Sequence, residues 1–106
     1  MRPTIYIAAA LFVSAAGVGF AATKSVYQKG RQFSEEVVVL KKGDELTFVN
    51  NDTVPHNIFS LSKGNKFDLG SQRPGTETDV TFTSVGDVQV MCAIHPRMKM
   101  LVKVTD

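Results

Sequence analysis

The sequence predicts an all-β fold, a β-sandwich of the Greek-key type. From residue 35 onward, short apolar or alternating segments are separated by residues that favour turns. No stretch repeats apolar side chains at the helical period of 3.6 residues. Several short strands at this spacing, in a chain without internal repeats, favour two packed sheets.

Two strands are predicted in the first half of this region. Residues 37–40 form a β-branched run that ends at the Lys-Lys-Gly-Asp turn over 41–44. Residues 46–49 alternate Leu and Phe with Thr and Val, and the Asn-Asn-Asp sequence over 50–52 does not easily continue a strand. A weaker pattern over 26–33 indicates a first strand.

The second half begins with a predicted loop over 61–75, which contains three glycines and a proline and room for one short strand at 66–69. Residues 80–82 alternate Val and Phe with Thr, and a turn follows over 84–87.

Two further strands are predicted near the C-terminus. Val88, Val90 and Cys92 fall on one face of a strand by the period of two. This register directs the Cys92 sulfur to the interior. Residues 100–104 form the last predicted strand.

A leader precedes the predicted domain. Arg2 is followed by an uncharged apolar run that ends in small residues near position 22. This pattern is typical of a secretory signal peptide, and Gly19 and Ala21 occupy the positions that a signal peptidase requires to be small. The alternative is an uncleaved anchor, because the run just reaches the lower length limit of a membrane span. The expected division is residues 1–21 as leader, 22–34 as N-terminal extension or first strand, and 35–106 as the main domain.

The distribution of charge gives no indication of nucleic-acid binding. The chain has 12 Lys and Arg residues against 10 Asp and Glu residues, and Arg2 is the only charged residue of the leader. Charges of both signs are mixed along the rest of the chain, whereas phosphate recognition needs clustered Lys and Arg. We expect a monomer with no nucleic-acid partner, and no membrane association unless the leader stays attached.

The single cysteine, Cys92, is unusual for a small exported domain. Such domains commonly depend on disulfides, but this chain has no second cysteine. A domain of about 85 residues is only marginally stable on its core alone, so a bound metal ion is a plausible substitute.

The side chains that could bind a soft metal lie in two short segments. His56 follows a predicted strand, whereas Cys92, His95 and Met98 share a tight turn near the C-terminus. Ligands at the end of a strand and on a tight turn can converge without long flexible side chains. We expect Met98 to be the fourth ligand, with Met100 as the alternative, because a final strand that starts at Met100 keeps its register after a short loop.

This set of ligands favours copper. Two imidazoles, one thiolate and a weak thioether suit Cu(II) and Cu(I) about equally. A rigid β-framework then keeps the geometry nearly constant between the two states, which favours fast electron transfer. Zinc gains nothing from the thioether because it has no redox chemistry. The predicted cofactor is therefore one copper ion.

These segments resemble the copper-binding motifs of the cupredoxin (blue copper) family, most closely those of amicyanin and plastocyanin. The resemblance rests on Val54-Pro55-His56-Asn57 and Cys92-x-x-His95-Pro96-x-Met98, joined by Thr81-Phe82-Thr83-x-x-Gly86. It extends over roughly 35–104 and is loose over 61–75.

The resemblance implies a role for each motif residue. It implies that His56, Cys92, His95 and Met98 bind copper, and that Asn57 ties the two ligand loops together and hydrogen-bonds near the thiolate sulfur.

The resemblance also implies a surface around His95 that docks redox partners, with Pro55, Pro96 and Arg97 as its rim. That surface is usually apolar in the family. The charge of Arg97 therefore makes it unsafe to carry the family's partners over to this chain.

The leading functional hypothesis is a periplasmic protein that carries single electrons on one copper ion and turns over no substrate. Its expected partners are redox proteins, such as a c-type cytochrome or a dehydrogenase. The alternative is a periplasmic copper storage or delivery protein, in which Met98 and Met100 both serve Cu(I). A Cys92–His95 nucleophile pair is disfavoured because one tight loop offers neither an orienting third group nor an oxyanion-binding helix terminus.

Overall fold

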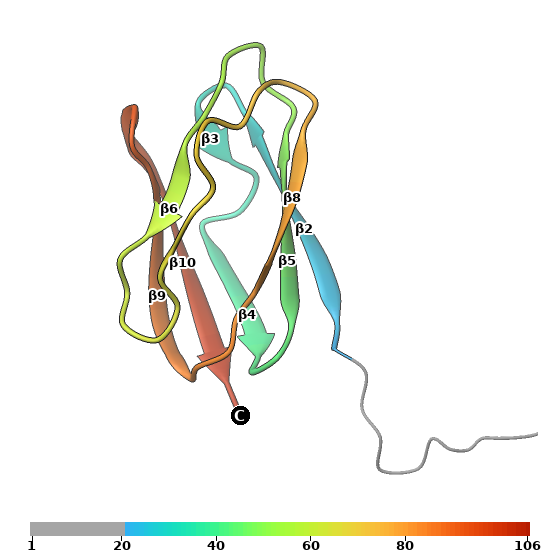
Figure 1. Ribbon diagram of the computed structural model, residues 1–106, viewed down its shortest axis with the longest axis vertical. Helices are drawn as coiled ribbons and strands as arrows, with labels where there is room; N and C mark the ends of the chain where they lie inside the picture. Colours follow the sequence, from blue (N-terminus) through green and yellow to red (C-terminus); the bar gives the residue numbers. More distant parts are fainter. Residues whose placement is uncertain (1–20) are drawn as a thin grey trace, which may run out of the picture.

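The computed structural model describes residues 21–106, which form a sandwich of two β-sheets (Figure 1). One sheet has the order β4-β10-β9-β6-β7 and the other the order β3-β2-β5-β8. The strands are β2 (Thr23–Lys29), β3 (Gln32–Phe33), β4 (Val37–Lys41), β5 (Glu45–Asn50), β6 (Ile58–Ser60), β7 (Phe67–Asp68), β8 (Glu77–Thr81), β9 (Gly86–Cys92) and β10 (His95–Thr105). These residues contain no helix, which confirms the predicted all-β sandwich.

The predicted leader lies outside the described residues, except for its last residue, Ala21. No helix that could span a membrane occurs in the described range.

Both sheets combine antiparallel and parallel pairs. β2 runs parallel to β5, and β10 runs parallel to β4, whereas the other paired strands are antiparallel. Parallel neighbours cannot be joined by a tight hairpin, so the chain must cross between the sheets. It does so from β3 to β4, β4 to β5, β5 to β6, β7 to β8 and β8 to β9, as expected for Greek-key connections.

The core lies between the inner faces of the two sheets. Side chains alternate in β4, where Val38 and Leu40 are buried and their neighbours are exposed. The same alternation buries Val88, Val90 and Cys92 in β9, as the period of two predicted. The buried apolar side chains are Val26, Val38, Leu40, Leu46, Phe48, Ile58, Phe82, Val88, Val90, Cys92, Met98, Met100, Val102 and Val104.

The segment over 26–33 is a hairpin rather than a single strand. β2 ends at Lys29, β3 starts at Gln32, and these two residues pair. Gly30 and Arg31 between them have φ values of 62° and 57°, the positive values of a type I′ turn. Gly-Arg is a much weaker turn sequence than Asn-Gly, so the pattern gave no sign of a break here.

The last strand begins earlier than expected, at His95 instead of Met100. His95 pairs with Cys92 across a two-residue turn, and the register then shifts before Lys99 pairs with Met91. Pro96 lies within this irregular stretch and has no N–H to donate to the ladder. The ligand turn is therefore the tip of a β-hairpin.

β6 was not predicted, because three residues are too few to show a pattern. Its first residue, Ile58, pairs with Cys92 at the end of β9. This pairing places the preceding loop, which carries His56, beside the cysteine. The β5–β6 loop, the β2–β3 turn and the β9–β10 turn all lie at the end of the sandwich that is opposite the C-terminus (Figure 1).

Candidate metal centre

Three of the predicted ligands meet at this end of the sandwich. The Cys92 sulfur lies 3.8 Å from Nδ1 of His56 and 3.7 Å from Nδ1 of His95, and the two Nδ1 atoms are 3.0 Å apart. His56 and Cys92 are buried, whereas His95 is partly exposed. Metal–ligand bonds of about 2.0–2.3 Å separate neighbouring ligand atoms by about 3–4 Å, so the spacing and the chemistry of these atoms fit one small soft metal ion.

The orientation of His56 is set by a carboxylate. Oδ2 of Asp52 lies 2.9 Å from Nε2 of the imidazole and also accepts a hydrogen bond from the Arg31 amide at 2.9 Å. Because a carboxylate accepts, the imidazole proton belongs on Nε2, and the lone pair of Nδ1 faces Cys92 and His95. The Arg31 amide, and after it the His56 ring, hold the pKa of Asp52 well below its ordinary value.

A buried network of hydrogen bonds fixes the loop that carries His56. The main chain of His56 pairs with that of Gln72 in both directions, at 3.1 and 2.7 Å. The Asn50 side-chain amide donates to the carbonyl oxygens of Gln72 and Val54, and its Oδ1 accepts from the Asp52 amide. The Gln72 side chain donates to the Phe48 carbonyl. Since these groups are buried and hydrogen-bonded, the loop has a single well-defined position.

The loop carrying His56 is linked to the cysteine through Asn57. The Asn57 amide donates to the Cys92 sulfur at 3.4 Å, and the Ala93 amide donates to the Asn57 carbonyl at 2.9 Å. The Asn57 side chain turns away and donates to the Asp68 carboxylate at 2.8 Å. Asp68 also accepts from the Gly70 amide, and these two donors lower its pKa, the amide more strongly. The link between the ligand loops thus uses the backbone of Asn57.

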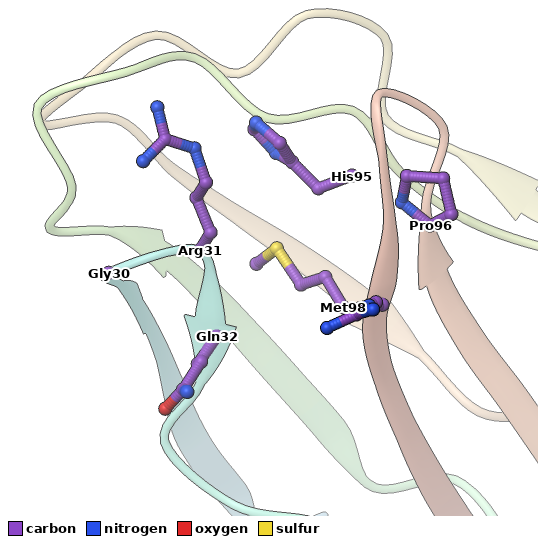
Figure 2. A pocket seen from close by; sticks show the side chains of 7 residues that line it. Gly30, Arg31, Gln32, His95, Pro96 and Met98 are labelled. Carbon is purple, nitrogen blue, oxygen red and sulfur yellow. The ribbon is translucent and has the colours of Figure 1, made fainter.

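The two methionines lie at different depths in β10. Both side chains are buried, but Met100 pairs with Val90, two residues further into the sandwich than Cys92. Met98 lies in the irregular stretch beside the cysteine and lines the same hollow as His95. Figure 2 shows its side chain extending from β10 on the same side as that of His95. Met98 is therefore the methionine positioned for a fourth contact.

His95 connects the site with the surface. Partial burial lowers the pKa of its imidazole, the nearby His56 ring and Arg31 guanidinium lower it further, and the Asp52 carboxylate acts in the opposite direction. The three predicted rim residues, Pro55, Pro96 and Arg97, are all exposed. Pro96 and Arg97 line the hollow next to His95.

Sequence reasoning missed three residues of this site. Asp52 lies four positions before His56 in the sequence, but an Asp and a His at this separation are common in segments that have no function. Gln72 lies in the segment where the family resemblance is loose, and its contact with His56 depends on tertiary structure. Arg31 reaches the site only because β2 and β3 form a hairpin, which the sequence pattern did not show.

This fold and this set of converging side chains define a mononuclear metal protein of the copper-binding β-sandwich class. The chain belongs to the plastocyanin/azurin family of copper binding proteins, whose family model matches residues 21–105. Membership in the cupredoxins and copper as the cofactor are thereby confirmed. The matched range includes β2 and β3 as well as the region where the motifs lie.

Related proteins agree with this assignment. The chain is 34% identical over 61 residues to the methylamine utilization protein MauL of Methylorubrum extorquens, which corresponds to 57% of this chain and 54% of that protein. The chain thus spans about half the length of this relative.

Solved structures share the fold. One is the reduced state of an amicyanin mutant, with a TM-score of 0.69 and 26% identity, covering 86% of this chain and 89% of that chain. Another is a purple cupredoxin from Nitrosopumilus maritimus, with a TM-score of 0.69 and 24% identity, covering 77% of this chain and 99% of that chain. A copper-containing nitrite reductase from Thermus scotoductus matches over 82% of this chain but only 23% of its own, with a TM-score of 0.72 and 24% identity.

Proposed function

We propose that this protein is a periplasmic electron carrier, with its copper held by His56, Cys92, His95 and Met98. The observation that carries the proposal is the convergence of one sulfur and two imidazole nitrogens from separate loops, all within 4.8 Å of one another. Bound copper would supply the one-electron change between Cu(II) and Cu(I). Family membership supports electron transfer as the general class of activity.

The residues around the site favour electron transfer because they keep the ligands still. The His56 ring is fixed by Asp52 and its main chain by Gln72, while the Cys92 sulfur accepts the Asn57 amide. The Gln72 and Asn57 contacts each join two different segments of the sandwich, whereas Asp52 holds the His56 ring from within the same loop. A site held from several sides does not rearrange when its metal changes charge, which keeps the reorganisation cost low.

His95 gives the protein a short route to a partner. It is the partly exposed ligand, whereas His56 and Cys92 are buried. A redox protein docked on the rim of Pro55, Pro96 and Arg97 would come closest to the copper at the His95 ring. A c-type cytochrome or a dehydrogenase is the proposed donor or acceptor, and the protein itself turns over no substrate.

Export to the periplasm is the corresponding proposal for location. It rests on the leader pattern of residues 1–21 and on a sole cysteine that copper would occupy and protect from oxidation. Fractionation of cells and the intact mass of the purified protein would test it. A protein that retains residues 1–21 in the cytoplasm would contradict it.

Copper storage or delivery remains the second candidate function. It was expected to use both Met98 and Met100 for Cu(I). Of these two methionines, Met100 is buried in the core and pairs with Val90, whereas Met98 lines the hollow beside His95, which supports the electron carrier. A carrier should keep its copper through repeated redox cycles, whereas a delivery protein should surrender Cu(I) to an acceptor.

Visible and paramagnetic-resonance spectra of the copper-loaded protein test the proposal. We expect an intense thiolate-to-copper charge-transfer band, and we expect Cys92→Ser to abolish it because serine offers no thiolate. Met100→Leu serves as the matched control and should leave the band in place. A colourless or pale Cu(II) complex of the unaltered protein would refute the proposed site.

A further inference from the structure

An open hollow of about 490 Å³ lies beside His95, where the β2–β3 turn faces the β9–β10 turn (Figure 2). Its walls are formed by Gly30, Arg31, Gln32, His95, Pro96, Arg97 and Met98. Two of these residues are arginines, Arg31 on the β2–β3 turn and Arg97 near the start of β10, and both are exposed. The partly exposed ligand therefore lies in a concave surface that two arginines also line.

Arg31 has a backbone conformation that is unfavourable for arginine. Its φ of 57° lies in the left-handed region, which glycine, asparagine or aspartate adopts more readily in a type I′ turn. The Asp52 carboxylate holds the Arg31 amide in this conformation and contacts the His56 ring with the same oxygen. Figure 2 shows the Arg31 side chain rising from the turn toward the level of the His95 ring. The turn thus carries a cation to the site at a conformational cost.

The arginines of the described residues all belong to this end of the sandwich. Besides Arg31 and Arg97, Arg73 directly follows Gln72, the main-chain partner of His56. None of the three forms an ion pair with another described residue. Their charges are therefore available to an outside partner.

None of the described acidic side chains lines the hollow beside His95. The Asp52 side chain is only 10% exposed and accepts hydrogen bonds from the Arg31 and Thr53 amides. Glu35 and Glu36 line a smaller hollow beyond Arg97; Glu35 pairs with Lys24 at 3.5 Å, and Glu36 is exposed. The near balance of charge over the whole chain hides this local excess of positive charge.

We propose that Arg31 and Arg97 form a cationic rim around His95 that recognises a partner by aspartate and glutamate carboxylates surrounding its own redox centre. The proposal rests on the proposed function and names the class of partner. A guanidinium binds a carboxylate with two parallel hydrogen bonds, which fixes orientation as well as contact. A positive concave surface also attracts an acidic partner from a distance and raises its association rate.

Nuclear magnetic resonance of the copper(I)-loaded protein tests the rim without requiring electron transfer. We expect an acidic-faced c-type cytochrome to shift the amide signals over 30–32 and 93–95 and of Arg97, with binding that weakens as salt increases. A basic-faced cytochrome should produce no such shifts. Replacing both rim arginines (R31Q with R97Q) should weaken binding of the acidic cytochrome roughly ten-fold at low salt, because rim charges govern such encounters.

The matched control removes two positive charges at the opposite end of the sandwich (K41Q with K42Q). It should change binding by less than about two-fold, since charges more than a Debye length from the interface are screened. Equal weakening by both double variants, binding of the basic cytochrome at the rim, or absence of amide shifts with the acidic one would each overturn the proposal.

Electron exchange on the same samples separates the two proposals. Exchange with both cytochromes that is unaffected by the rim substitutions would overturn the rim and leave the electron carrier intact. Salt-sensitive binding of the acidic cytochrome at the rim, without a thiolate band or electron exchange, would support the rim and overturn the electron carrier.

Discussion

His56 is constrained at both of its ring nitrogens. Nδ1 faces the Cys92 sulfur and Nε2 faces the Asp52 carboxylate, and the side chain is completely buried. A buried imidazole without such a partner would be free to flip or to hold its proton on the wrong nitrogen. The Asp52 carboxylate therefore acts on the metal through the ligand ring rather than by direct contact.

We expect Asp52→Asn to lower copper affinity by about 10–100-fold, the usual cost of losing a partner that orients a ligand. The neutral amide accepts more weakly from Nε2 and loses the charge-assisted bond. Competition with a Cu(I) chelator would measure the change. Asp68→Asn is the matched control, because Asp68 contacts Asn57 and Gly70 instead of a ligand ring. Equal losses in the two variants would contradict an orienting role for Asp52.

Met98 and Met100 offer a second comparison between single residues. We expect Met98→Gln to lower the reduction potential while copper stays bound, because an amide oxygen is a harder ligand that favours Cu(II). Voltammetry would measure the shift. Met100→Leu is nearly volume-conserving and should leave the potential unchanged, at a stability cost below about 1.5 kcal/mol. A shift caused by Met100→Leu and not by Met98→Gln would exchange the two assignments.

At the scale of single residues, the ligand residues could be predicted from the sequence, but the orientation of the His56 ring could not. The spacing of Cys92, His95 and Met98 was enough to expect one site, because a tight turn limits where its side chains can go. Asp52 could not be recognised in the same way. Its role follows from the direction of the His56 ring, which depends on the pairing of the His56 main chain with Gln72 and on the Asn50–Gln72 hydrogen bond, both between residues distant in the sequence.

At the scale of elements, the site is assembled by pairing between strands and turns of very different length. The strands β5 and β9 were predicted from alternation and β4 from its β-branched run; β5 and β9 lie inside their sheets, whereas β4 lies at an edge. The short strands β3 and β6 were not predicted as separate strands. Even so, β6 places His56 beside Cys92, and β3 completes the turn that carries Arg31. Strands of two or three residues have too few side chains to show a period, so only tertiary pairing defines them.

The β4–β5 turn shows how one carboxylate can join two segments. Oδ2 of Asp44 accepts from the Lys41 amide at 2.9 Å, and Oδ1 accepts from the Ala22 amide at 3.0 Å, just before β2. These two donors, the Lys41 amide first, hold the pKa of Asp44 below its ordinary value of 3.8. The ionised carboxylate is therefore the form that stabilises the fold.

We expect Asp44→Asn to lower the thermal unfolding midpoint at neutral pH and to have less effect in acid. The pKa is lower in the folded state, so the contribution is fully present above the unfolded value near 3.8 and is lost as the pH falls through the folded value. Unfolding midpoints of both proteins between pH 7 and about pH 2 would show the difference narrowing in acid. Asp87→Asn, a carboxylate with only a long and exposed ion pair to Lys103, is the control. A difference that widens in acid would contradict this account.

At the scale of the whole molecule, the sandwich relies on one continuous core without a disulfide. Cys92 is the only cysteine and is buried, so no covalent cross-link restrains the described residues. The overall class of fold followed from the strand pattern, because alternation and turn residues alone exclude a helical protein. The order of the strands within each sheet could not be predicted from that pattern, because the parallel pairing of β10 with β4 joins segments more than sixty residues apart.

Copper should therefore act as a structural link as well as a redox centre. It would join the β5–β6 loop to the β9–β10 hairpin. The strands β6, β7 and β8 lie between these two segments in the sequence. A ligand that binds only the folded state adds about 4 kcal/mol at a free concentration a thousand times its dissociation constant. For a domain of this size, each kcal/mol moves the unfolding midpoint by about 4–8 °C.

We accordingly expect removal of copper to lower the unfolding midpoint by about 15–30 °C, and re-addition to restore it. Calorimetry of the metal-free and copper(I)-loaded protein would measure the difference. Cys92→Ser should reduce the copper-dependent part sharply, because the neutral hydroxyl is a poor ligand for Cu(I), whereas Met100→Leu should retain it. If loading with copper left the midpoint of the unaltered protein unchanged, the ion could not bridge the two loops, and both the structural link and the proposed ligand set would have to be abandoned.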